Sequence, residues 1–284
     1  MMSIAQIIRQ TKMDQLPLIG PLIRFIGLPI KNLLYADSGV IASVDGLVDI
    51  RLSPKSFSGG FFSFDSKLTK ELQHLAKPGR HFVDAGAHVG ICSLLYAKLT
   101  GPETRIASFD PSPAIHPLLF DNARINGFPM ETYRAALGDR SGTVSFFFDH
   151  KDPNASLSKD APGKYWYWEN REKPTLVECR VPMMTLDHFC NAVGFEPGLL
   201  KLDVEGAERL VLEGGRQTIQ KYRPIIILET HVFAWESFGY TREMLEATIR
   251  ELRYAIYDQD EKPFTGPLGT GPMRDNNHYI LKPL

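Results

Sequence analysis

The stretch HFVDAGAHVG, residues 81–90, joins an apolar run to a helical pattern and decides the fold of this chain. Residues 81–86 predict a buried strand, and the residues from about 90 to 99 predict a helix that follows it directly. Gly86 and Gly90 permit positive φ angles and close backbone approach, while the N–H groups at the start of the helix attract an anionic group. A strand, a glycine turn and a helix in this order indicate the ligand-binding end of a parallel sheet.

The same alternation continues toward the C-terminus, and it predicts an α/β fold. We expect a doubly wound, mostly parallel seven-stranded sheet with helices on both faces and an antiparallel C-terminal edge strand. The further strands are expected at 105–110, 131–135, 199–203, 224–230, 254–257 and 278–281, and the helices at about 113–126, 205–222 and 242–252.

Two segments lie outside this pattern. Residues 1–65 are interpreted as an N-terminal extension, an apolar helical segment followed by a β-hairpin cap around Asp45-Gly46, and residues 66–284 as the main domain, which opens with a helix at about 65–76. An insertion at about 140–198 contains TVSFFF (143–148) and LVECRV (176–181), which look like a strand pair. The pair encloses Tyr165, Trp166, Tyr167 and Trp168, so we assign the insertion to substrate binding, with a packed β-arm as the alternative.

Charge and cysteine usage limit the partners of the 284-residue chain. Lys+Arg 32 and Asp+Glu 33 nearly cancel, which disfavours nucleic acid as a partner. Cys92, Cys179 and Cys190 form no CxxC pattern, and they indicate a reducing cytoplasm. The apolar segment 15–35 is interrupted by three prolines, Arg24 and Lys31, so a spanning helix is not expected. Its alternatives are packing on its own domain, a homodimer contact or a peripheral contact with a membrane.

Two carboxylates flank the glycine turn. Asp84 ends its strand two positions before Gly86, where a carboxylate can meet an ammonium group. Asp110 ends the next strand, where an acid can accept hydrogen bonds from ribose hydroxyls. The turn GAHVG lacks the third glycine of a dinucleotide fingerprint, and Asp84 brings a negative charge to the pyrophosphate position. The pattern therefore favours adenosine attached to an amino acid over adenosine attached to a diphosphate.

Several segments together carry a family resemblance. They are VDAGAHVG at 83–90, FDPSP at 109–113, Asn122 with Asn126, ALGDRSGTVSF at 136–146, TLD at 185–187, KLDVEGAE at 201–208 with VLEGG at 211–215, and IILETH at 226–231. In these segments, between about Gly79 and His231, the chain resembles the FkbM family of class I, Rossmann-like, S-adenosylmethionine-dependent methyltransferases, mostly O-methyltransferases.

The resemblance implies S-adenosylmethionine as cofactor and assigns residues to it. Asp84, Gly86 and Gly90 would hold the methionine end, Asp110 the ribose, and the loop from Ala136 to Asp139 would border the adenine. The full set of cofactor-binding residues expected is Asp84, Gly86, Ala87, His88, Gly90, Asp110, Pro111, Ala136, Asp139 and Asp203. At position 88 the family commonly has Asn where this chain has His.

Four residues are the candidates for catalysis: Asp203, Glu205, Glu229 and His231. Ligands of open α/β sheets bind at the carboxyl ends of the strands, where these residues lie. A sulfonium methyl is already reactive, so the protein has to position the acceptor and take the hydroxyl proton. His231 would be the base and Glu229 its orienting carboxylate, with a purely structural histidine as the alternative. Glu208 is expected to cap a helix and Lys201 to pair with a carboxylate.

No metal site is assigned, since Asp203 and Glu229 are only two carboxylates. The sequence predicts O-methylation of a hydroxyl on a sugar, a glycolipid or a secondary metabolite by in-line transfer, with a small-molecule, sugar or lipid-linked acceptor. Two alternatives stay open, an NAD-dependent oxidoreductase and a catalytically silent methyltransferase-like binding scaffold.

Overall fold

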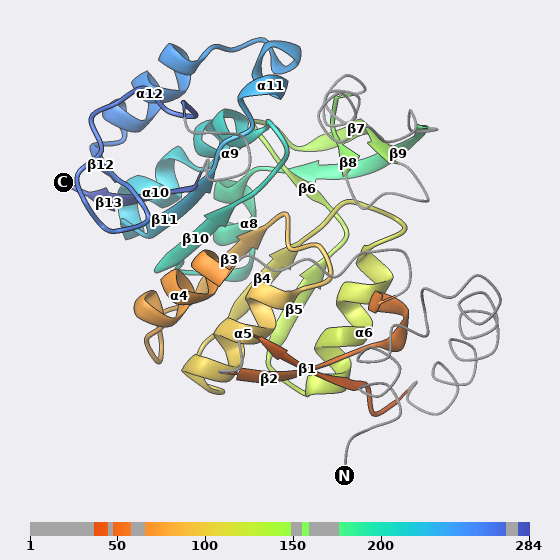
Figure 1. The fold of residues 1–284 in the computed structure, drawn as a ribbon. Coiled ribbons are helices and arrows are strands. Elements are labelled where there is room, and N and C mark those ends of the chain that lie inside the picture. Colours follow the sequence, from red (N-terminus) through yellow and green to blue (C-terminus); the bar gives the residue numbers. More distant parts are fainter. Residues whose placement is uncertain (1–36, 45–47, 58–65, 149–154, 159–175, 271–277) are drawn as a thin grey trace, which may run out of the picture.

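The computed structural model describes residues 37–44, 48–57, 66–148, 155–158, 176–270 and 278–284. Its centre is a seven-stranded sheet with the order β12-β13-β11-β10-β3-β4-β5 (Figure 1). The strands are β3 (Phe82–Ala85), β4 (Ile106–Phe109), β5 (Met130–Tyr133), β10 (Leu199–Leu202), β11 (Ile225–Glu229), β12 (Tyr254–Tyr257) and β13 (His278–Pro283). The first five run parallel, while β13 is antiparallel to both of its neighbours. The predicted sheet is confirmed, with the antiparallel strand lying one place inside the edge that β12 forms.

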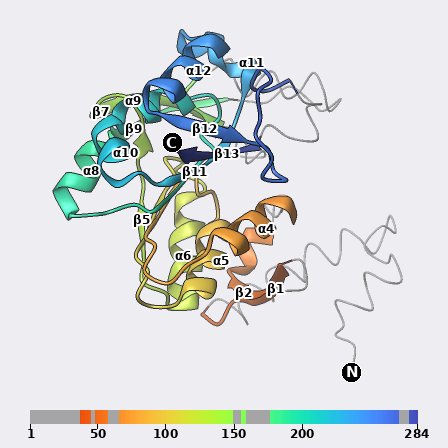
Figure 2. The ribbon, with the colours of Figure 1, turned by 90° about the vertical axis from the view of Figure 1, so that its left-hand side faces the viewer.

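Helices cover both faces of this sheet (Figures 1 and 2). One face carries α4 (Ser66–Leu75), α5 (Ile91–Thr100) and α6 (His116–Asn126), and the other carries α8 (Leu186–Val193), α9 (Glu208–Gly214), α10 (Arg216–Tyr222) and α12 (Arg242–Glu251). Successive strand residues point to opposite faces, so Phe82 packs with α4 and α5 while Val83 and Ala85 pack with the second group. Both faces are therefore apolar, which accounts for the continuous hydrophobic runs in the sequence.

The chain order reverses at β3, which pairs with β4 on one side and with β10 on the other. The carboxyl ends of these parallel strands meet at one edge of the sheet. In doubly wound folds the crevice beside such a switch point is where ligands bind. The fold thus brings together the segments after β3, β4, β10 and β11.

The predicted hairpin is confirmed in strands β1 (Val40–Val44) and β2 (Val48–Leu52), whose turn lies outside the described residues. Two side chains of α6 attach it to the main domain. The amide of Asn126 accepts from the backbone N–H of Arg51 (3.0 Å) and donates to its carbonyl (2.6 Å). The amide of Asn122 accepts from the backbone N–H of Ser53 at 2.7 Å, just before the 3-10 helix η3 (Pro54–Phe57). The two asparagines of the NxxxN motif therefore attach the hairpin to α6 by hydrogen bonds to its backbone.

The insertion, together with β6 just before it, forms a second, four-stranded sheet with the order β6-β9-β7-β8 (upper right in Figure 1). Its strands are β6 (Ala136–Leu137), β7 (Gly142–Phe148), β8 (Ala155–Ser156) and β9 (Val177–Met184). The antiparallel pairing of β7 with β9 confirms the predicted strand pair. Tyr165, Trp166, Tyr167 and Trp168 lie outside the described residues, so their role in substrate binding stays a prediction.

Two boundaries differ from expectation. The single helix expected at 205–222 is wrong, because α9 ends at Gly214 and α10 begins at Arg216. A glycine pair separates them, and a Cβ at Gly214 would lie 2.0 Å from the carbonyl oxygen of Gly138, so only glycine allows this approach. The last part of the 140–198 insertion is also not a substrate arm: it forms α8, whose Leu186 and Phe189 belong to the main core.

The apolar segment 15–35 lies outside the described residues, and its membrane, dimer and packing alternatives stay predictions. Among the helices that the structure describes, none is long and apolar enough to cross a membrane.

Candidate functional site

Asp84 and Lys201 stand directly opposite each other in the register of β3 and β10. The Lys201 ammonium lies 3.3 Å from Asp84 Oδ1 and 3.0 Å from Asp203 Oδ2, and it donates to the carbonyl of Gly86 at 3.1 Å. Asp84 is fully buried and also accepts from the Ser93 hydroxyl at 2.6 Å. The carboxylate therefore meets an ammonium, as its position suggests, but that ammonium belongs to the chain itself. The pairing expected for Lys201 is confirmed.

The turn after β3 is shaped by residues with positive φ. Gly86, His88 and Gly90 have φ angles of 78°, 52° and 88°. A Cβ at Gly86 would lie 1.7 Å from the carbonyl oxygen of Asp203, which shows how closely the turn packs on the end of β10. A Cβ at Gly90 would lie 2.6 Å from Leu119 Cδ1 of α6, so this glycine permits helix packing rather than ligand approach.

Asp110 ends β4 beside this turn. Its two carboxylate oxygens each accept one backbone N–H, from His88 at 3.0 Å and from Ser112 at 2.9 Å. Burial raises the pKa of Asp110 to about 7, against the two hydrogen bonds, which lower it. A carboxylate oxygen has two lone pairs, so each can accept a further hydrogen bond. This is the chemistry that a pair of ribose hydroxyls requires.

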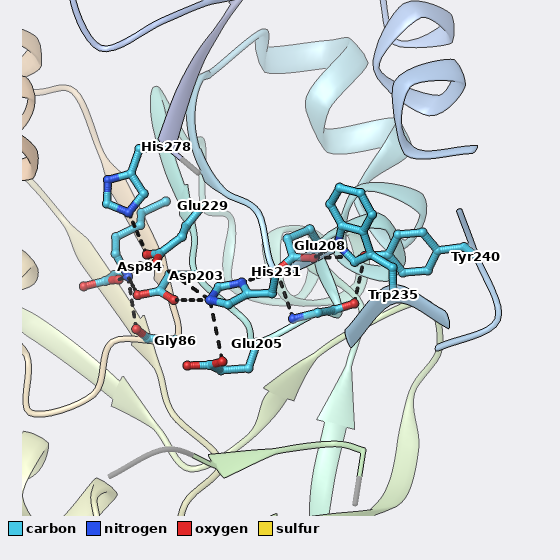
Figure 3. A network of polar contacts seen from close by, with 12 residues as sticks. Asp84, Gly86, Asp203, Glu205, Glu208, Glu229, His231, Trp235, Tyr240 and His278 are labelled. Atoms are coloured by element: carbon cyan, nitrogen blue, oxygen red, sulfur yellow. Dashed lines mark hydrogen bonds and ion pairs between the residues drawn. The ribbon is translucent and has the colours of Figure 1, made fainter. Parts of the chain in front are cut away.

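Glu208 is a buried acceptor at the start of α9, and it orients His231. Its Oε1 lies 2.7 Å from His231 Nδ1 and accepts from the backbone N–H of Gly206 at 2.9 Å. Its Oε2 accepts from the indole N–H of Trp235 and from the hydroxyl of Tyr240, both at 2.9 Å. These two residues come from α11 (Val232–Trp235) and from the segment after the 3-10 helix η4 (Glu236–Phe238). Figure 3 shows the His231 ring between Glu208 on one side and Asp203 and Glu205 on the other.

The other ring nitrogen of His231 faces carboxylates. Nε2 lies 3.6 Å from Glu205 Oε2, 3.7 Å from Glu229 Oε1 and 3.8 Å from Asp203 Oδ1 (Figure 3). Burial lowers the pKa of His231, but the charges of Glu205, Glu208 and Glu229 more than offset it and hold the pKa well above its usual value. Burial raises the pKa of Glu205 to about 7, against the charge of His231. The side chains of Asp203, Glu205 and Glu229 remain a quarter to a third exposed.

The structure brings all four predicted catalytic residues together, but it corrects the pairing within them. The expectation that Glu229 orients His231 is wrong: Glu229 Oε2 pairs with His278 Nε2 at 2.8 Å, and the hydrogen-bonded carboxylate of His231 is Glu208. Helix capping was expected for Glu208, and it does accept from Gly206, but its main partners are side chains.

The remaining predicted cofactor residues lie after β3, after β4 and in or just after β6 of the second sheet. Ala87 is buried in the glycine turn and Pro111 follows Asp110 directly. Ala136 is buried in β6, and Asp139, just after it, pairs with Arg140 at 3.0 Å. Their contacts with a cofactor stay predictions.

Comparisons with known proteins identify the family of this chain. The family model described as Methyltransferase FkbM domain matches residues 84–256, which is more than half of the chain. The chain is similar to 2-O-methyltransferase NoeI of Sinorhizobium fredii, with 29% identity over 161 residues that cover 52% of this chain and 63% of that protein. It is also similar to Methyltransferase sdnD of Sordaria araneosa, with 28% identity over 195 residues, covering 61% of this chain and 73% of that protein.

A solved structure, Methyltransferase FkbM from Methylobacillus flagellatus KT, is similar at 14% identity and a TM-score of 0.42, over 80% of this chain and 46% of that one. The sequence match with NoeI spans 63% of the length of that relative. The family match favours a methyltransferase over an NAD-dependent oxidoreductase.

Proposed function

This chain belongs to the FkbM methyltransferase family, and we propose that it transfers a methyl group from S-adenosylmethionine to a hydroxyl oxygen of a sugar, a glycolipid or a secondary metabolite. The observation that carries the proposal is the juxtaposition of Asp110 and the glycine turn with His231 and its surrounding carboxylates at one end of the sheet. A nucleoside site and a proton-accepting site side by side are what this reaction needs. The relative named 2-O-methyltransferase supports oxygen as the accepting atom.

The residues present fit the cofactor. Asp110 keeps acceptor capacity on both carboxylate oxygens for the ribose, and Pro111 adjoins it. The turn Gly86-Ala87-His88 would hold the methionine end, where Asp203 is the carboxylate with exposed surface, and Gly90 would support the turn by letting α6 pack against it. Asp84 acts there indirectly, because it fixes Lys201, which in turn holds the Gly86 carbonyl and Asp203. Ala136 and Asp139 border the adenine.

The cofactor, when bound, supplies a methyl group on a positively charged sulfur that is ready for displacement. The chain supplies position and a place for the proton. Asp203, Glu205, Glu229 and His231 would face the acceptor hydroxyl, and Glu208 holds the His231 ring with its Nε2 on that side. A positioned proton acceptor contributes about 10²- to 10⁴-fold to such a step.

The cofactor part is tested by calorimetric titration of the purified chain with S-adenosylhomocysteine. We expect binding at micromolar levels, and loss of at least tenfold in affinity for Asp110→Ala. Asp121→Ala, on α6, is the matched control, and its affinity should equal that of the unchanged chain. Absence of binding by a chain with a cooperative unfolding transition would refute the proposal, as would equal affinity in Asp110→Ala.

The acceptor part is tested with radiolabelled methyl donor and separated extracts. Carbohydrate, lipid and small-molecule fractions are offered in turn, and the labelled product is hydrolysed to identify the methylated atom. Label on an oxygen of a sugar, glycolipid or small metabolite is the expected result. Label on nitrogen, or only on nucleic acid, would overturn the proposed acceptor class while leaving the methyl transfer itself intact.

A further inference from the structure

His231 has the geometry of a metal-binding histidine, because one ring nitrogen contacts a carboxylate and the other ring nitrogen faces a group of oxygens. Its side chain is 3% exposed, and its Nδ1 contacts Glu208, which is itself fully buried. Within the described part of the chain its Nε2 makes no hydrogen bond, and the nearest oxygens stand 3.6 to 3.8 Å away. Metal-binding histidines usually donate their second ring N–H to a carboxylate, which fixes the ring and the tautomer. Glu208 provides that carboxylate.

The spacing of the surrounding oxygens matches a coordination shell. One ligand atom from each of Asp203, Glu205 and His231 lies within 4.8 Å of the other two. Two ligands at about 2.1 Å from an ion are roughly 3.4 Å apart at the tetrahedral angle and up to about 4.2 Å apart at wider angles. The distances from Nε2 to Glu205 and Asp203, 3.6 and 3.8 Å, are close to these values and too long for direct hydrogen bonds.

The local charge also calls for a cation. Five carboxylates gather here, those of Asp84, Asp203, Glu205, Glu208 and Glu229. Lys201 lies between Asp84 and Asp203, and it contacts Asp203 through Oδ2. Oδ1 of Asp203 is the atom that faces His231, so the ammonium and the proposed ion use different oxygens of one carboxylate. His278 pairs with Glu229 and His231 Nδ1 with Glu208, which leaves Glu205 and one oxygen of Asp203 around His231 Nε2, where a divalent ion would offset their charge.

We propose that Asp203, Glu205 and His231 bind a divalent transition-metal ion at the carboxyl ends of β10 and β11. Two carboxylate oxygens and one imidazole nitrogen suit Mn²⁺, Fe²⁺, Co²⁺ or Zn²⁺ better than Mg²⁺, which prefers oxygen alone. Asp203 and Glu229 alone did not support a metal site, whereas the structure places Glu205 and the oriented imidazole of His231 beside Asp203.

The role of the ion in catalysis rests on the proposed function, whereas its binding does not. An ion at this place would acidify the acceptor hydroxyl, and Glu229, outside the three ligands, would then receive the proton. Metal binding itself needs neither cofactor nor acceptor, so it is measured without them. If binding fails while methyl transfer persists in a chelator, this inference falls and the proposed function stands.

The first test titrates Mn²⁺ into the chelator-treated, full chain and follows the free ion by electron paramagnetic resonance. We expect one Mn²⁺ bound per chain, at least tenfold weaker binding by Glu205→Gln, and unchanged binding by Glu103→Gln, a control at an exposed loop position. Circular dichroism verifies that each variant is folded. No bound Mn²⁺ at millimolar concentration, or equal affinity in Glu205→Gln, overturns the proposal.

The second test identifies the histidine without a substitution that risks the fold. Co²⁺ is added to the unchanged chain, and proton NMR spectra are recorded in H₂O and in D₂O. The Nδ1 proton between His231 and Glu208 should give one strongly shifted, exchangeable signal, because it sits on a ring that the paramagnetic ion contacts. A Co²⁺ complex without such a signal shows that His231 is not a ligand and overturns the site as drawn.

Discussion

Glu208→Gln is the substitution that most directly tests the site's architecture. The change keeps the shape of the side chain and replaces one acceptor oxygen by an amino group. Each oxygen of Glu208 has two donors against it, Gly206 N–H and His231 on one, Trp235 and Tyr240 on the other. A backbone N–H and an indole N–H can only donate. Either orientation of the amide therefore sets one obligatory donor against another.

The expected loss of stability follows from the number of donors around Glu208. A buried donor without a partner costs about 1–3 kcal/mol, and hydrogen bonds to a charged acceptor are each worth about 1.5–3 kcal/mol. His231 and Tyr240 can adapt, by tautomer change and by hydroxyl rotation, so not all four contacts are lost. We expect the free energy of unfolding to fall by about 3–5 kcal/mol, the usual range for breaking a buried pair. A domain with about 5–15 kcal/mol of stability would still fold.

Equilibrium unfolding in urea, followed by circular dichroism, measures the change. Tyr240→Phe removes a hydroxyl whose single proton lies within hydrogen-bond distance of both Glu208 Oε2 and the carbonyl of Gly206, and it should lower the free energy of unfolding by about 1–2 kcal/mol. A Glu208→Gln variant within about 0.5 kcal/mol of the unchanged chain, with the same dependence on urea, would refute the role of Glu208 as a charged acceptor.

Three further predictions concern the elements around the site. Asn126→Ala removes two hydrogen bonds to the backbone of Arg51 and should cost about 1–3 kcal/mol in urea unfolding; no change would mean that the apolar contacts of the hairpin suffice. Gly86→Ala places a methyl group 1.7 Å from the carbonyl oxygen of Asp203 at a φ of 78°. We expect the free energy of unfolding to fall by at least about 3 kcal/mol and cofactor binding to weaken. A thermal midpoint within about 2 °C of that of the unchanged chain would contradict the close packing. Burial raises the pKa of Asp110 from 3.8 to about 7, so between about pH 4 and 7 the folded chain keeps a proton that the unfolded chain loses. The free energy of unfolding should therefore fall as the pH rises through this range. Asp110→Asn should flatten this dependence, and a variant with the same pH profile as the unchanged chain would count against the shifted pKa.

The layered architecture was predictable because periodicity and chain order determine it. Strands that are apolar on both faces, separated by helical patterns, lead to a parallel sheet with its helices on both sides. The boundary at Gly215 was less accessible, since two glycines in a helical pattern are tolerated in some proteins and interrupt the helix in others. The close approaches of Gly138 to Gly214 and of Leu186 to Gly215 explain why glycines stand here, and both contacts join segments far apart in the sequence.

The polar residues of the site were predictable in position and not in partnership. The rule that ligands bind at the carboxyl ends of parallel strands selects Asp203 and Glu229 without knowledge of any contact. It gives no information on which acid meets which base. Asp84 was expected to face a bound ammonium group, whereas its neighbour in the register is Lys201, one strand away in space and more than a hundred residues away in the chain. Which residues of two strands lie opposite each other after a long crossover depends on tertiary packing and not on the local sequence.

Glu208 shows where sequence reasoning can be extended. Its place at the first turn of a helix made capping the default interpretation. Buried tryptophan and tyrosine side chains usually need an acceptor for their polar atoms, and Trp235 and Tyr240 follow His231 within ten residues. Three such donors close together in the chain require an acceptor from elsewhere, and an ionised carboxylate offers the most lone pairs. A search for unmatched buried donors would therefore have pointed to an acid such as Glu208, where a search for catalytic motifs did not.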